Sequence, residues 1–400
     1  MNADFRRFRI TAKVPESAII TSFYLAPIDN EPLWQAAPGQ YLTLRIPTDS
    51  VDSFVLRTYS ISADVTQSNE TRITVKREAA PPHSPNAPIG VGSCWLHDQA
   101  EVGTELDIAA PRGRFFLDET SSSPVMLLSG GVGLTPLLSM LHSLVKTRRQ
   151  AWFLHGCDNG IVHAMSAEVN ELVKISNGRI QQHVCYRKPV AEDLRGKDFH
   201  SDGYIDNALL ESLRPSDPCD WYLCGPTAFM VAQYQHLLEL DVPEERIAYE
   251  FFGKAQSLPA LVAERAKETQ PIKPTVSLAP AGADAPDTLK NLAHLTNPDA
   301  WAVDSVDDLE IRTSSNTTEV VFERSSITAH WSDTTESILE LAEQQGLDPD
   351  FSCRSGICGS CMCAIKEGDV EYFEEPLDKP DDGYVLICCS RPKGRVVLDL

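Results

Sequence analysis

Residues 353–361 read Cys353-Arg-Ser-Gly-Ile-Cys358-Gly-Ser-Cys361, and this C-x4-C-x2-C spacing decides the fold of the C-terminal part. A later pair, Cys388-Cys389, can supply a fourth thiolate. Four thiolates that converge from a tight loop are the ligand set of a [2Fe–2S] cluster. Structural zinc is the alternative, but it usually takes two C-x2-C knuckles, and the sequence has no second one. The spacing therefore predicts a [2Fe–2S] cluster.

The distribution of the other cysteines fits a redox protein better than a disulfide-bonded one. Six of the 11 cysteines fall within residues 353–389, and the other five are scattered over the first 224 residues. The N-terminus is basic but lacks the apolar stretch of a signal peptide. Clustered cysteines without an export signal indicate a metal or redox centre, so we expect a cytoplasmic protein.

Length and charge restrict the remaining classes. A chain of 400 residues is long enough for two or three domains, and 42% hydrophobic residues are sufficient for packed cores. The net charge of −22 disfavours nucleic acid and anionic membranes as partners. The most apolar stretch, residues 125–145, is interrupted by glycines and by Pro136, so we expect no membrane insertion.

The first part of the chain alternates short strands with turn residues. Strands are predicted at residues 8–14, 19–26, 41–46, 57–61, 72–77 and 105–109. Short strands separated by Gly, Pro and Asp are typical of an antiparallel barrel, which we assign to residues 1–118.

From Pro124 onward, strands alternate with amphipathic helices. The strands VMLLS, AWFLH, IQQHVC and WYLC are interleaved with helices predicted at residues 136–146, 164–174 and 226–240, and a last strand spans 247–252. This alternation indicates an α/β domain with a parallel sheet over residues 119–253.

A segment of different composition precedes the C-terminal module. Residues 254–316 hold six prolines and few aromatic residues, so we interpret them as a linker. In residues 317–400, two strands precede a helix at 337–345, for which Asp333 and Glu336 form a predicted capping box. Residues 319–400 contain 17 acidic and seven basic residues, so this module is strongly negative.

Three motifs in the first two domains indicate nucleotide binding. Arg57-Thr58-Tyr59-Ser60 lies on a predicted strand, and Gly90-Val91-Gly92-Ser93 opens a helix whose free amides suit a phosphate. The turn Gly130-Gly131-Val132-Gly133-Leu134-Thr135-Pro136 follows an apolar strand and precedes a helix, with Thr135 as predicted N-cap and Pro136 in the first turn. Its glycines permit the backbone to approach a pyrophosphate closely.

The C-terminal module resembles plant-type ferredoxin, from its strands and helix to the closing VLICCSRP. The resemblance implies a β-grasp fold and a last ligand four residues before a proline, so that Pro392 indicates Cys388. Cys389 is the fallback ligand and Cys363 a packing residue. The implied metal ligands are Cys353, Cys358, Cys361 and Cys388.

Residues 5–253 resemble the ferredoxin–NADP reductase superfamily, above all the reductase half of flavohaemoglobins, whose motifs run in the same order. The resemblance implies that Arg57 contacts the flavin phosphates and that Tyr59 and Ser60 contact the isoalloxazine and ribityl groups. It places Glu78 near the flavin adenosine. It assigns the pyrophosphate turn to Gly90, Gly92 and Ser93, although relatives usually have a β-branched residue in place of Gly92.

The same resemblance implies a nicotinamide dinucleotide site in the second domain. The dinucleotide turn is assigned to Gly130, Gly131, Gly133, Thr135 and Pro136, and the nicotinamide end to Cys224, Gly225 and Pro226. Phe252 is expected to stack on the isoalloxazine, with the Glu250 carboxylate nearby. Taken singly, Phe252 and Cys224 suit a core as well, and Ser60 a strand end. The candidate catalytic residues are Ser60, Cys224, Glu250 and Phe252.

The resemblance also favours particular cofactors. FAD is expected rather than FMN because the likeness is to the flavohaemoglobin-type glycine turn and helix. NADH is expected rather than NADPH because the segment His155-Gly-Cys-Asp158-Asn159-Gly lacks an Arg or Lys cluster for a 2′-phosphate. No globin precedes the barrel, so nitric oxide dioxygenation by a haem is not expected.

These cofactors imply an order of electron flow. A nicotinamide gives up a hydride, a cluster takes one electron at a time, and a flavin can do both, so we expect NADH, FAD, [2Fe–2S] and then an external acceptor. The resemblance favours a Rieske-type oxygenase as acceptor, with a hybrid-cluster protein as the alternative. A self-sufficient NADH oxidase or small-molecule reductase and a redox-sensing carrier stay open. The acidic tail predicts a partner with a basic docking face.

Overall fold

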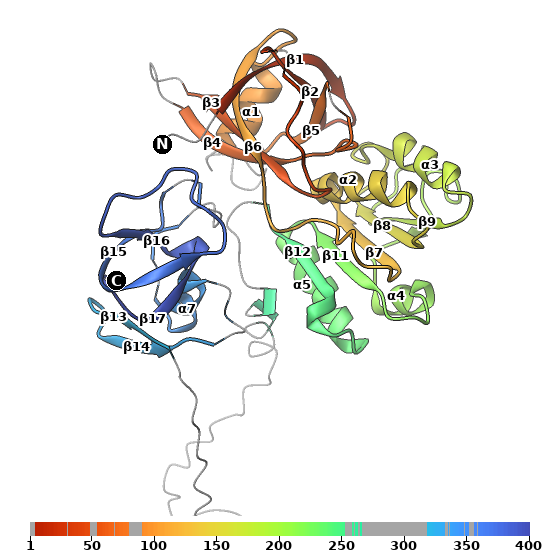
Figure 1. Cartoon of the computed structure of the whole chain (residues 1–400). Coiled ribbons are helices and arrows are strands. Elements are labelled where there is room, and N and C mark those ends of the chain that lie inside the picture. The colour runs from red at the N-terminus through yellow and green to blue at the C-terminus, as the bar shows by residue number, and fades with distance from the viewer. Residues whose placement is uncertain are drawn as a thin grey trace, which may run out of the picture. The chain divides into compact units, whose positions relative to one another are not determined.

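A computed structural model contains three sheets, each with its own set of helices or turns (Figure 1). None of the described helices is long and apolar enough to cross a membrane. Most of the predicted linker, together with Cys353 and Cys358, lies outside the described residues. The structure describes residues 5–29, 31–48, 54–67, 69–79, 90–252, 258–259, 261–262, 265, 318–332, 335, 337–347, 349–351, 356–357 and 359–400.

The first sheet is the predicted antiparallel barrel. Its strands pair in the order β4-β3-β6-β1-β2-β5. A bridge between Ile61 and Ile73, together with a hydrogen bond of 2.9 Å from the Ser62 amide to the Arg72 carbonyl, joins the two end strands and closes the sheet. The elements are β1 (Phe5–Pro15), β2 (Ile20–Pro27), β3 (Tyr41–Pro47), β4 (Phe54–Ser60), β5 (Thr71–Lys76), α1 (Val91–Asp98) and β6 (Glu105–Arg112).

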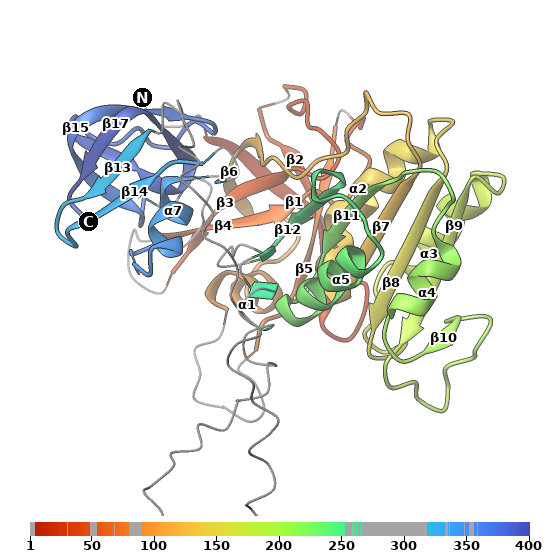
Figure 2. The same cartoon turned by 90° about the horizontal axis from the view of Figure 1, so that it is seen from below.

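The second sheet is parallel throughout, as the alternation of strands and helices predicts. Its order is β10-β9-β8-β7-β11-β12. On β7, Val125 and Leu127 belong to the core formed with α2 and α3, whereas Met126 and Leu128 belong to the core formed with α4 and α5. Figure 2 shows the strands of this sheet side by side. The elements are β7 (Val125–Gly130), η1 (Gly131–Gly133), α2 (Leu134–Val145), β8 (Ala151–Cys157), α3 (Ser166–Ile175), β9 (Ile180–Tyr186), β10 (Ser201–Asp202), α4 (Asn207–Leu213), β11 (Asp220–Cys224), α5 (Thr227–Glu239), η2 (Glu244–Arg246) and β12 (Ile247–Glu250).

The third sheet has five strands in the order β14-β13-β17-β15-β16. β13 and β17 are parallel, and the other pairs are antiparallel. Helix α7 packs its apolar residues, among them Ile338 and Leu341, into the core of this sheet. A helix on a small mixed sheet agrees with the predicted ferredoxin fold. The elements are β13 (Glu319–Phe322), β14 (Ile327–His330), α7 (Ile338–Gln344), β15 (Met362–Tyr372), β16 (Tyr384–Leu386), η5 (Ile387–Cys389) and β17 (Ser390–Leu398).

Three local predictions are wrong. Thr135 is not an N-cap: the turn η1 runs directly into α2, so Thr135 lies inside the helix and its hydroxyl donates to the Val132 carbonyl at 3.1 Å. Helix α7 is capped by Ser337, whose hydroxyl accepts from the Glu340 amide, and not by Asp333 and Glu336, which lie outside the described residues. The last strand of the parallel sheet ends at Glu250, two residues earlier than predicted.

Candidate flavin, nicotinamide and cluster sites

The predicted flavin residues of β4 lie over the first turn of α1. A β-carbon on Gly92 would stand 2.7 Å from Arg57 Cγ and 2.9 Å from Tyr59 Oη, so these two side chains cover that turn. Burial raises the pKa of the Tyr59 hydroxyl above its usual range, which keeps it protonated as a hydrogen-bond donor. Ser60 is buried and pairs with Tyr41 across β3 and β4.

A second set of contacts ties the segment after β5 to the same helix start. The Gly90 amide donates to the Glu78 carbonyl at 2.8 Å. The Ser93 hydroxyl accepts from the Glu78 amide at 3.2 Å and donates to the Gly90 carbonyl at 3.1 Å. Glu78 is thereby held beside the N-terminus of α1, as the resemblance implies for the adenosine end of a flavin.

This arrangement fits the diphosphate of FAD. The first amides of a helix have no partner within the helix and carry the positive end of its dipole. Arg57 adds a full positive charge beside them, and the absence of a β-carbon at Gly92 lets the Arg57 and Tyr59 side chains lie close to the helix start. The fold therefore brings together Arg57, Tyr59, Glu78, Gly90, Gly92 and Ser93 from three separate segments.

The order of the parallel sheet places the glycine turn at a topological switch point. From β7 the chain continues outward through β8, β9 and β10, and it returns to β11 and β12 on the other side of β7. In open α/β sheets, ligands bind in the crevice at such a point, outside the carboxyl ends of the strands. The predicted turn after β7 and the predicted Cys224-Gly225-Pro226 at the end of β11 therefore lie where sheets of this kind bind a ligand.

The two turns touch through their backbones. A β-carbon on Gly133 would stand 2.2 Å from the Cys224 carbonyl oxygen and 2.6 Å from the Gly225 nitrogen. Phe229, which was not predicted, fills the space behind both turns: β-carbons on Gly130 and Gly225 would lie 2.8 Å and 2.7 Å from its ring. Its only signal is an aromatic side chain in the first turn of the helix after Cys-Gly-Pro.

The other predicted residues of this site differ in their exposure. Gly131 has a φ of 52°, a left-handed conformation that glycine adopts readily. Thr135 and Pro136 are buried in the first turn of α2, and Pro136 therefore holds its predicted place. Pro226 is exposed and precedes α5 as its N-cap residue.

Glu250 ends β12 in register with Cys224, which is itself in register with Ser129 on β7. The Glu250 Oε2 atom is buried and has no hydrogen-bond partner among the described residues. Burial raises the pKa of this carboxyl to about 8, so it holds a proton at neutral pH. Burial also raises the pKa of the Cys224 thiol well above its usual value. Phe252, two residues beyond Glu250, is 44% exposed and free to meet a ligand.

Two of the four predicted cluster ligands are described. Cys361 and Cys388 are both buried in the core of the third sheet, and the Ile387 amide donates to the Cys361 carbonyl at 3.3 Å. Gly356 and Gly359 have φ values of 65° and 71°, a left-handed conformation that glycine adopts readily. Two buried thiols in one core fit two of the thiolate donors of a [2Fe–2S] cluster.

Cys389 has a different environment. Its thiol donates to the Leu386 carbonyl at 3.6 Å, and a β-carbon on Gly356 would stand 2.9 Å from its sulfur. This is the environment of a packing residue. The choice of Cys388 as the fourth ligand stays a prediction.

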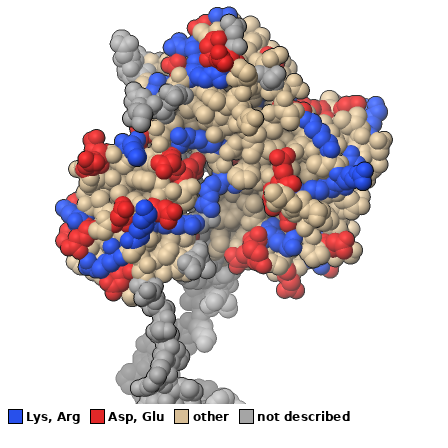
Figure 3. Space-filling model, viewed as in Figure 1, with Lys and Arg blue, Asp and Glu red and all other residues tan. Residues whose placement is uncertain are grey.

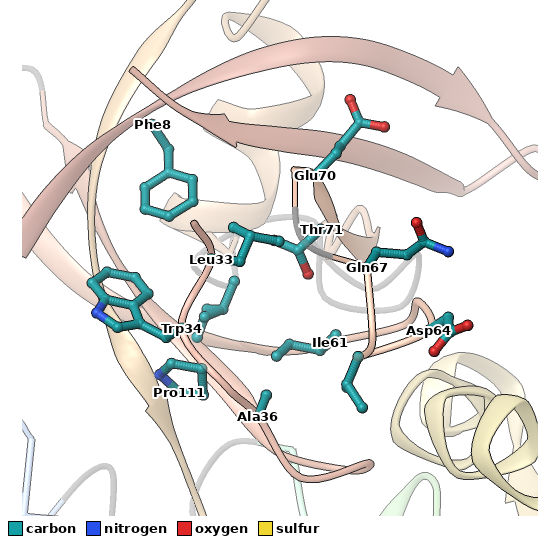
Figure 4. A pocket seen from close by; sticks show the side chains of 12 residues that line it. Phe8, Leu33, Trp34, Ala36, Ile61, Asp64, Gln67, Glu70, Thr71 and Pro111 are labelled. Atoms are coloured by element: carbon teal, nitrogen blue, oxygen red, sulfur yellow. The ribbon is translucent and has the colours of Figure 1, made fainter. Parts of the chain in front are cut away.

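The barrel contains a small pocket that does not belong to the candidate flavin site. Figure 4 shows Phe8, Leu33 and Trp34 on one side of it and Asp64, Gln67 and Glu70 on the other. The rings of Phe8 and Trp34 stack with centroids 5.5 Å apart. Its volume of about 20 Å³ suits only a water or two. None of its lining residues is among the predicted cofactor residues.

Comparisons with known protein families agree with the three sheets. The oxidoreductase FAD-binding domain family matches residues 7–117, the oxidoreductase NAD-binding domain family residues 127–235, and the 2Fe-2S iron-sulfur cluster binding domain family residues 320–393. A flavohemoprotein of Bacillus cereus is 39% identical over 257 residues, which are 64% of this chain and 62% of that protein. The chain thus spans less than two thirds of the length of this relative.

Two solved structures extend the comparison. The FAD/NAD-binding domain of a nitric oxide dioxygenase from Vibrio cholerae is 35% identical with a TM-score of 0.55, and the match covers 62% of this chain and 99% of that one. A type IV self-sufficient cytochrome P450 monooxygenase is similar in fold, with 18% identity and a TM-score of 0.54, over 99% of this chain and 41% of that one. The chain therefore belongs to the ferredoxin–NADP reductase superfamily, with a flavohaemoglobin-type FAD/NAD-binding half and a C-terminal [2Fe–2S] domain, which is the domain set of an NAD(P)H-dependent oxidoreductase.

Proposed function

We propose that this chain carries electrons from NADH through FAD to its [2Fe–2S] cluster and delivers them to an external protein, an oxygenase component of Rieske type. The observation that carries the proposal is that one chain has three features. They are the start of α1 covered by Arg57 and Tyr59, the backbone contact of Gly133 with Cys224 and the buried Cys361 and Cys388. These three features suit a flavin, a nicotinamide dinucleotide and a cluster, respectively, and electrons would pass from the nicotinamide to the flavin and from the flavin to the cluster.

The bound flavin would supply the change from a two-electron hydride to single electrons that a cluster requires. The residues of the chain bind and orient. Arg57 and the α1 amides would hold the flavin phosphates, and Tyr59 and Ser60 would contact the isoalloxazine and ribityl groups. The backbone contact at Gly133 would let the nicotinamide dinucleotide lie close to the turns after β7 and β11. Glu250 would hold a proton near the nicotinamide, and the exposed ring of Phe252 would cover the flavin until the nicotinamide enters.

An oxygenase acceptor follows from the resemblance to reductase components of oxygenases, and a hybrid-cluster protein is the second candidate. Among the structures of similar fold, the P450 monooxygenase unites this domain order with an oxygenase in its own chain. Clusters held by cysteine thiolates suit a reducing compartment, so we propose a cytoplasmic location.

We propose a basic docking face on the acceptor, because residues 319–400 carry ten more acidic than basic residues. Figure 3 shows acidic and basic side chains intermixed on the face that it displays, so the attraction would come from the net charge. Reduction of cytochrome c, a basic protein, should therefore slow as salt rises from 0.05 to 0.5 M, values chosen to bracket a Debye length of about 10 Å. Salt-independent reduction would remove the electrostatic part of the proposal.

The central test is Cys358→Ser, with Cys363→Ser as matched control, because Cys363 is a buried cysteine of the same module that is assigned to packing. Cys358→Ser should abolish the cluster absorption and the reduction of cytochrome c. It should spare the NADH-dependent reduction of ferricyanide, which draws electrons from the flavin directly. Loss of both activities in Cys358→Ser, or equal losses in the control, would overturn the modular electron path.

An anaerobic titration with NADH, followed by visible absorption and electron paramagnetic resonance, tests the order of transfer. Both the flavin and the cluster bands should bleach, and a rhombic signal of the reduced cluster should appear. A flavin that bleaches while the cluster stays oxidised would favour a redox-sensing carrier. Rapid turnover of a small substrate by the chain alone would favour a self-sufficient reductase.

A further inference from the structure

A buried arginine joins the barrel to the α/β domain. Both domains belong to one compact unit of the chain. Arg72 on β5 is 5% exposed, and its guanidinium has an acceptor for each of its five N–H groups. Three of the bonds stay in the barrel, to the Ser62 hydroxyl at 3.2 Å, the Tyr24 hydroxyl at 3.4 Å and the Ser62 carbonyl. The other two reach the carboxylate oxygens of Glu168 on α3, at 2.8 Å and 2.9 Å.

Glu168 is held from its own domain as well. The His142 imidazole, in the last turn of α2, contacts the same carboxylate at 2.6 Å. The residue before α3, Met165, has a φ of 61°, a left-handed conformation that residues other than glycine rarely adopt. Its sulfur accepts a hydrogen bond of 3.9 Å from the Ser22 hydroxyl on β2. Contacts with the barrel at Met165 and at Glu168 therefore fix the first turn of α3.

The ion pair suits a geometric role better than a stabilising one. Burial alone would raise the pKa of the Glu168 carboxyl, but hydrogen bonds from His142 and Arg72 lower it to about 2, so the carboxyl is ionised at neutral pH. Buried ion pairs often add little to net stability, because removing two charges from water is costly. A bidentate arginine–carboxylate pair has a defined geometry, since its two parallel bonds must be satisfied together.

The elements that the pair joins lead to both nucleotide sites. β5 ends two residues before Glu78, which is held beside the start of α1. α2, which carries His142, begins directly after the glycine turn η1. β5 also lies next to η1 itself. A change in the way Glu168 meets Arg72 would therefore shift one site against the other.

We propose that Glu168 is a positioning residue for hydride transfer: through Arg72 it fixes the α/β domain against the barrel, so that the nicotinamide meets the flavin at one distance. This inference rests on the proposed function, because it requires both cofactors. In the step concerned, a hydride leaves the nicotinamide and adds to the flavin, so that NADH becomes NAD⁺ and FAD becomes FADH⁻. The reacting atoms must lie within about 3.5 Å, and a misplacement of about 1 Å can slow such a step roughly a hundredfold.

The test is anaerobic stopped-flow reduction of the full-length holoprotein by NADH. Glu168→Gln should lower the limiting rate of flavin reduction about tenfold or more. The dissociation constant of NADH should not change, because the turns assigned to NADH lie within the α/β domain. Arg72→Lys keeps the charge but loses the bidentate geometry, so it should lower the same rate. Glu171→Gln is the matched control, because it removes an exposed partner of Lys174, 3.5 Å away, from the same helix.

Two further readouts separate position from a general loss of structure. Hydrogen exchange followed by mass spectrometry should become faster at β5 and at the first turn of α3 in Glu168→Gln, and should stay unchanged in Glu171→Gln. Photoreduction of the flavin with EDTA needs no nicotinamide, so the reduced flavin should pass electrons to the cluster at the wild-type rate in every variant.

An unchanged limiting rate in a folded Glu168→Gln or Arg72→Lys variant overturns the inference, and so does an equal loss in Glu171→Gln. Slow transfer from the photoreduced flavin to the cluster also overturns it, because the damage would then extend beyond the position of the nicotinamide. If Glu168→Gln does not fold, Arg72→Lys decides. A wild-type flavin that NADH does not reduce contradicts the proposed function itself, which is a different result.

Discussion

Gly92 and Gly133 both stand at the start of a helix that we assign to nucleotide phosphates, but their surroundings differ. A β-carbon on Gly133 would meet the backbone of Cys224 and Gly225, which belongs to the end of a neighbouring strand. A β-carbon on Gly92 would meet Arg57 Cγ and Tyr59 Oη, which are side-chain atoms. Backbone at a strand end cannot move without disturbing the sheet, whereas side chains can change rotamer.

Gly133 and Gly92 therefore have different roles. Gly133 is needed for the fold, because β7 and β11 approach each other only if this residue has no side chain. Gly92 leaves room for the side chains of Arg57 and Tyr59.

Gly133→Ala should have the largest effect. The new methyl group would force apart the carboxyl ends of β7 and β11, at a cost of about 2–3 kcal/mol in the free energy of unfolding. Chemical denaturation measures this, and NADH binding should be lost as well. Gly156→Ala is the control in the same sheet, because its β-carbon would meet nothing closer than 3.8 Å. Equal stability of the two variants would show that the backbone of Cys224 and Gly225 can move to accept a β-carbon at Gly133.

Glu250 provides a second test, of whether water is excluded from the carboxyl at the end of β12. Its pKa is raised from 4.5 to about 8, so the folded protein holds the proton more tightly than the unfolded chain does. The resulting stability is fully present below pH 4.5 and is lost as the pH rises toward 8. The melting temperature of the wild type should therefore fall between pH 5 and 8, and Glu250→Gln should flatten that fall. Parallel melting curves for the two proteins would show that the carboxyl is hydrated.

Phe252→Ala should act on kinetics more than on stability. The side chain is 44% exposed, so its removal should change the free energy of unfolding by only about 0.5 kcal/mol. Control of nicotinamide access should loosen, and the NADH to NADPH ratio of kcat/KM should change. Steady-state rates with both coenzymes check this. Unchanged kinetics and selectivity would remove Phe252 from the site.

Gly92→Ala should have the smallest effect. Arg57 and Tyr59 can rotate away from a methyl group, so the stability of the protein should change by less than about 1 kcal/mol. Fluorescence titration with FAD should show only a small loss of affinity. A large loss of flavin affinity, or a loss of stability as large as that of Gly133→Ala, would contradict the prediction. It would show that neither glycine position tolerates a β-carbon.

Local sequence patterns were sufficient for most of the architecture. The alternating strands of the barrel, the strand–helix alternation of the second domain and the strands of the third sheet follow from periodicity and turn residues. Patterns were less reliable at helix starts. The glycine turn became helical before Thr135, and Ser337 rather than Asp333 capped α7, because several nearby residues can satisfy the same free amides.

The sequence by itself determined the kinds of cofactor, through the cysteine spacing and the glycine turns, and the order of the three domains. Only the tertiary structure decided which residues meet. It placed Cys224 against Gly133, buried the Glu250 carboxyl and paired Arg187 with Asp158, 29 residues away. The physical reason is that parallel strands bring together residues separated by a whole helix, and strand order, which no local pattern specifies, selects the neighbours.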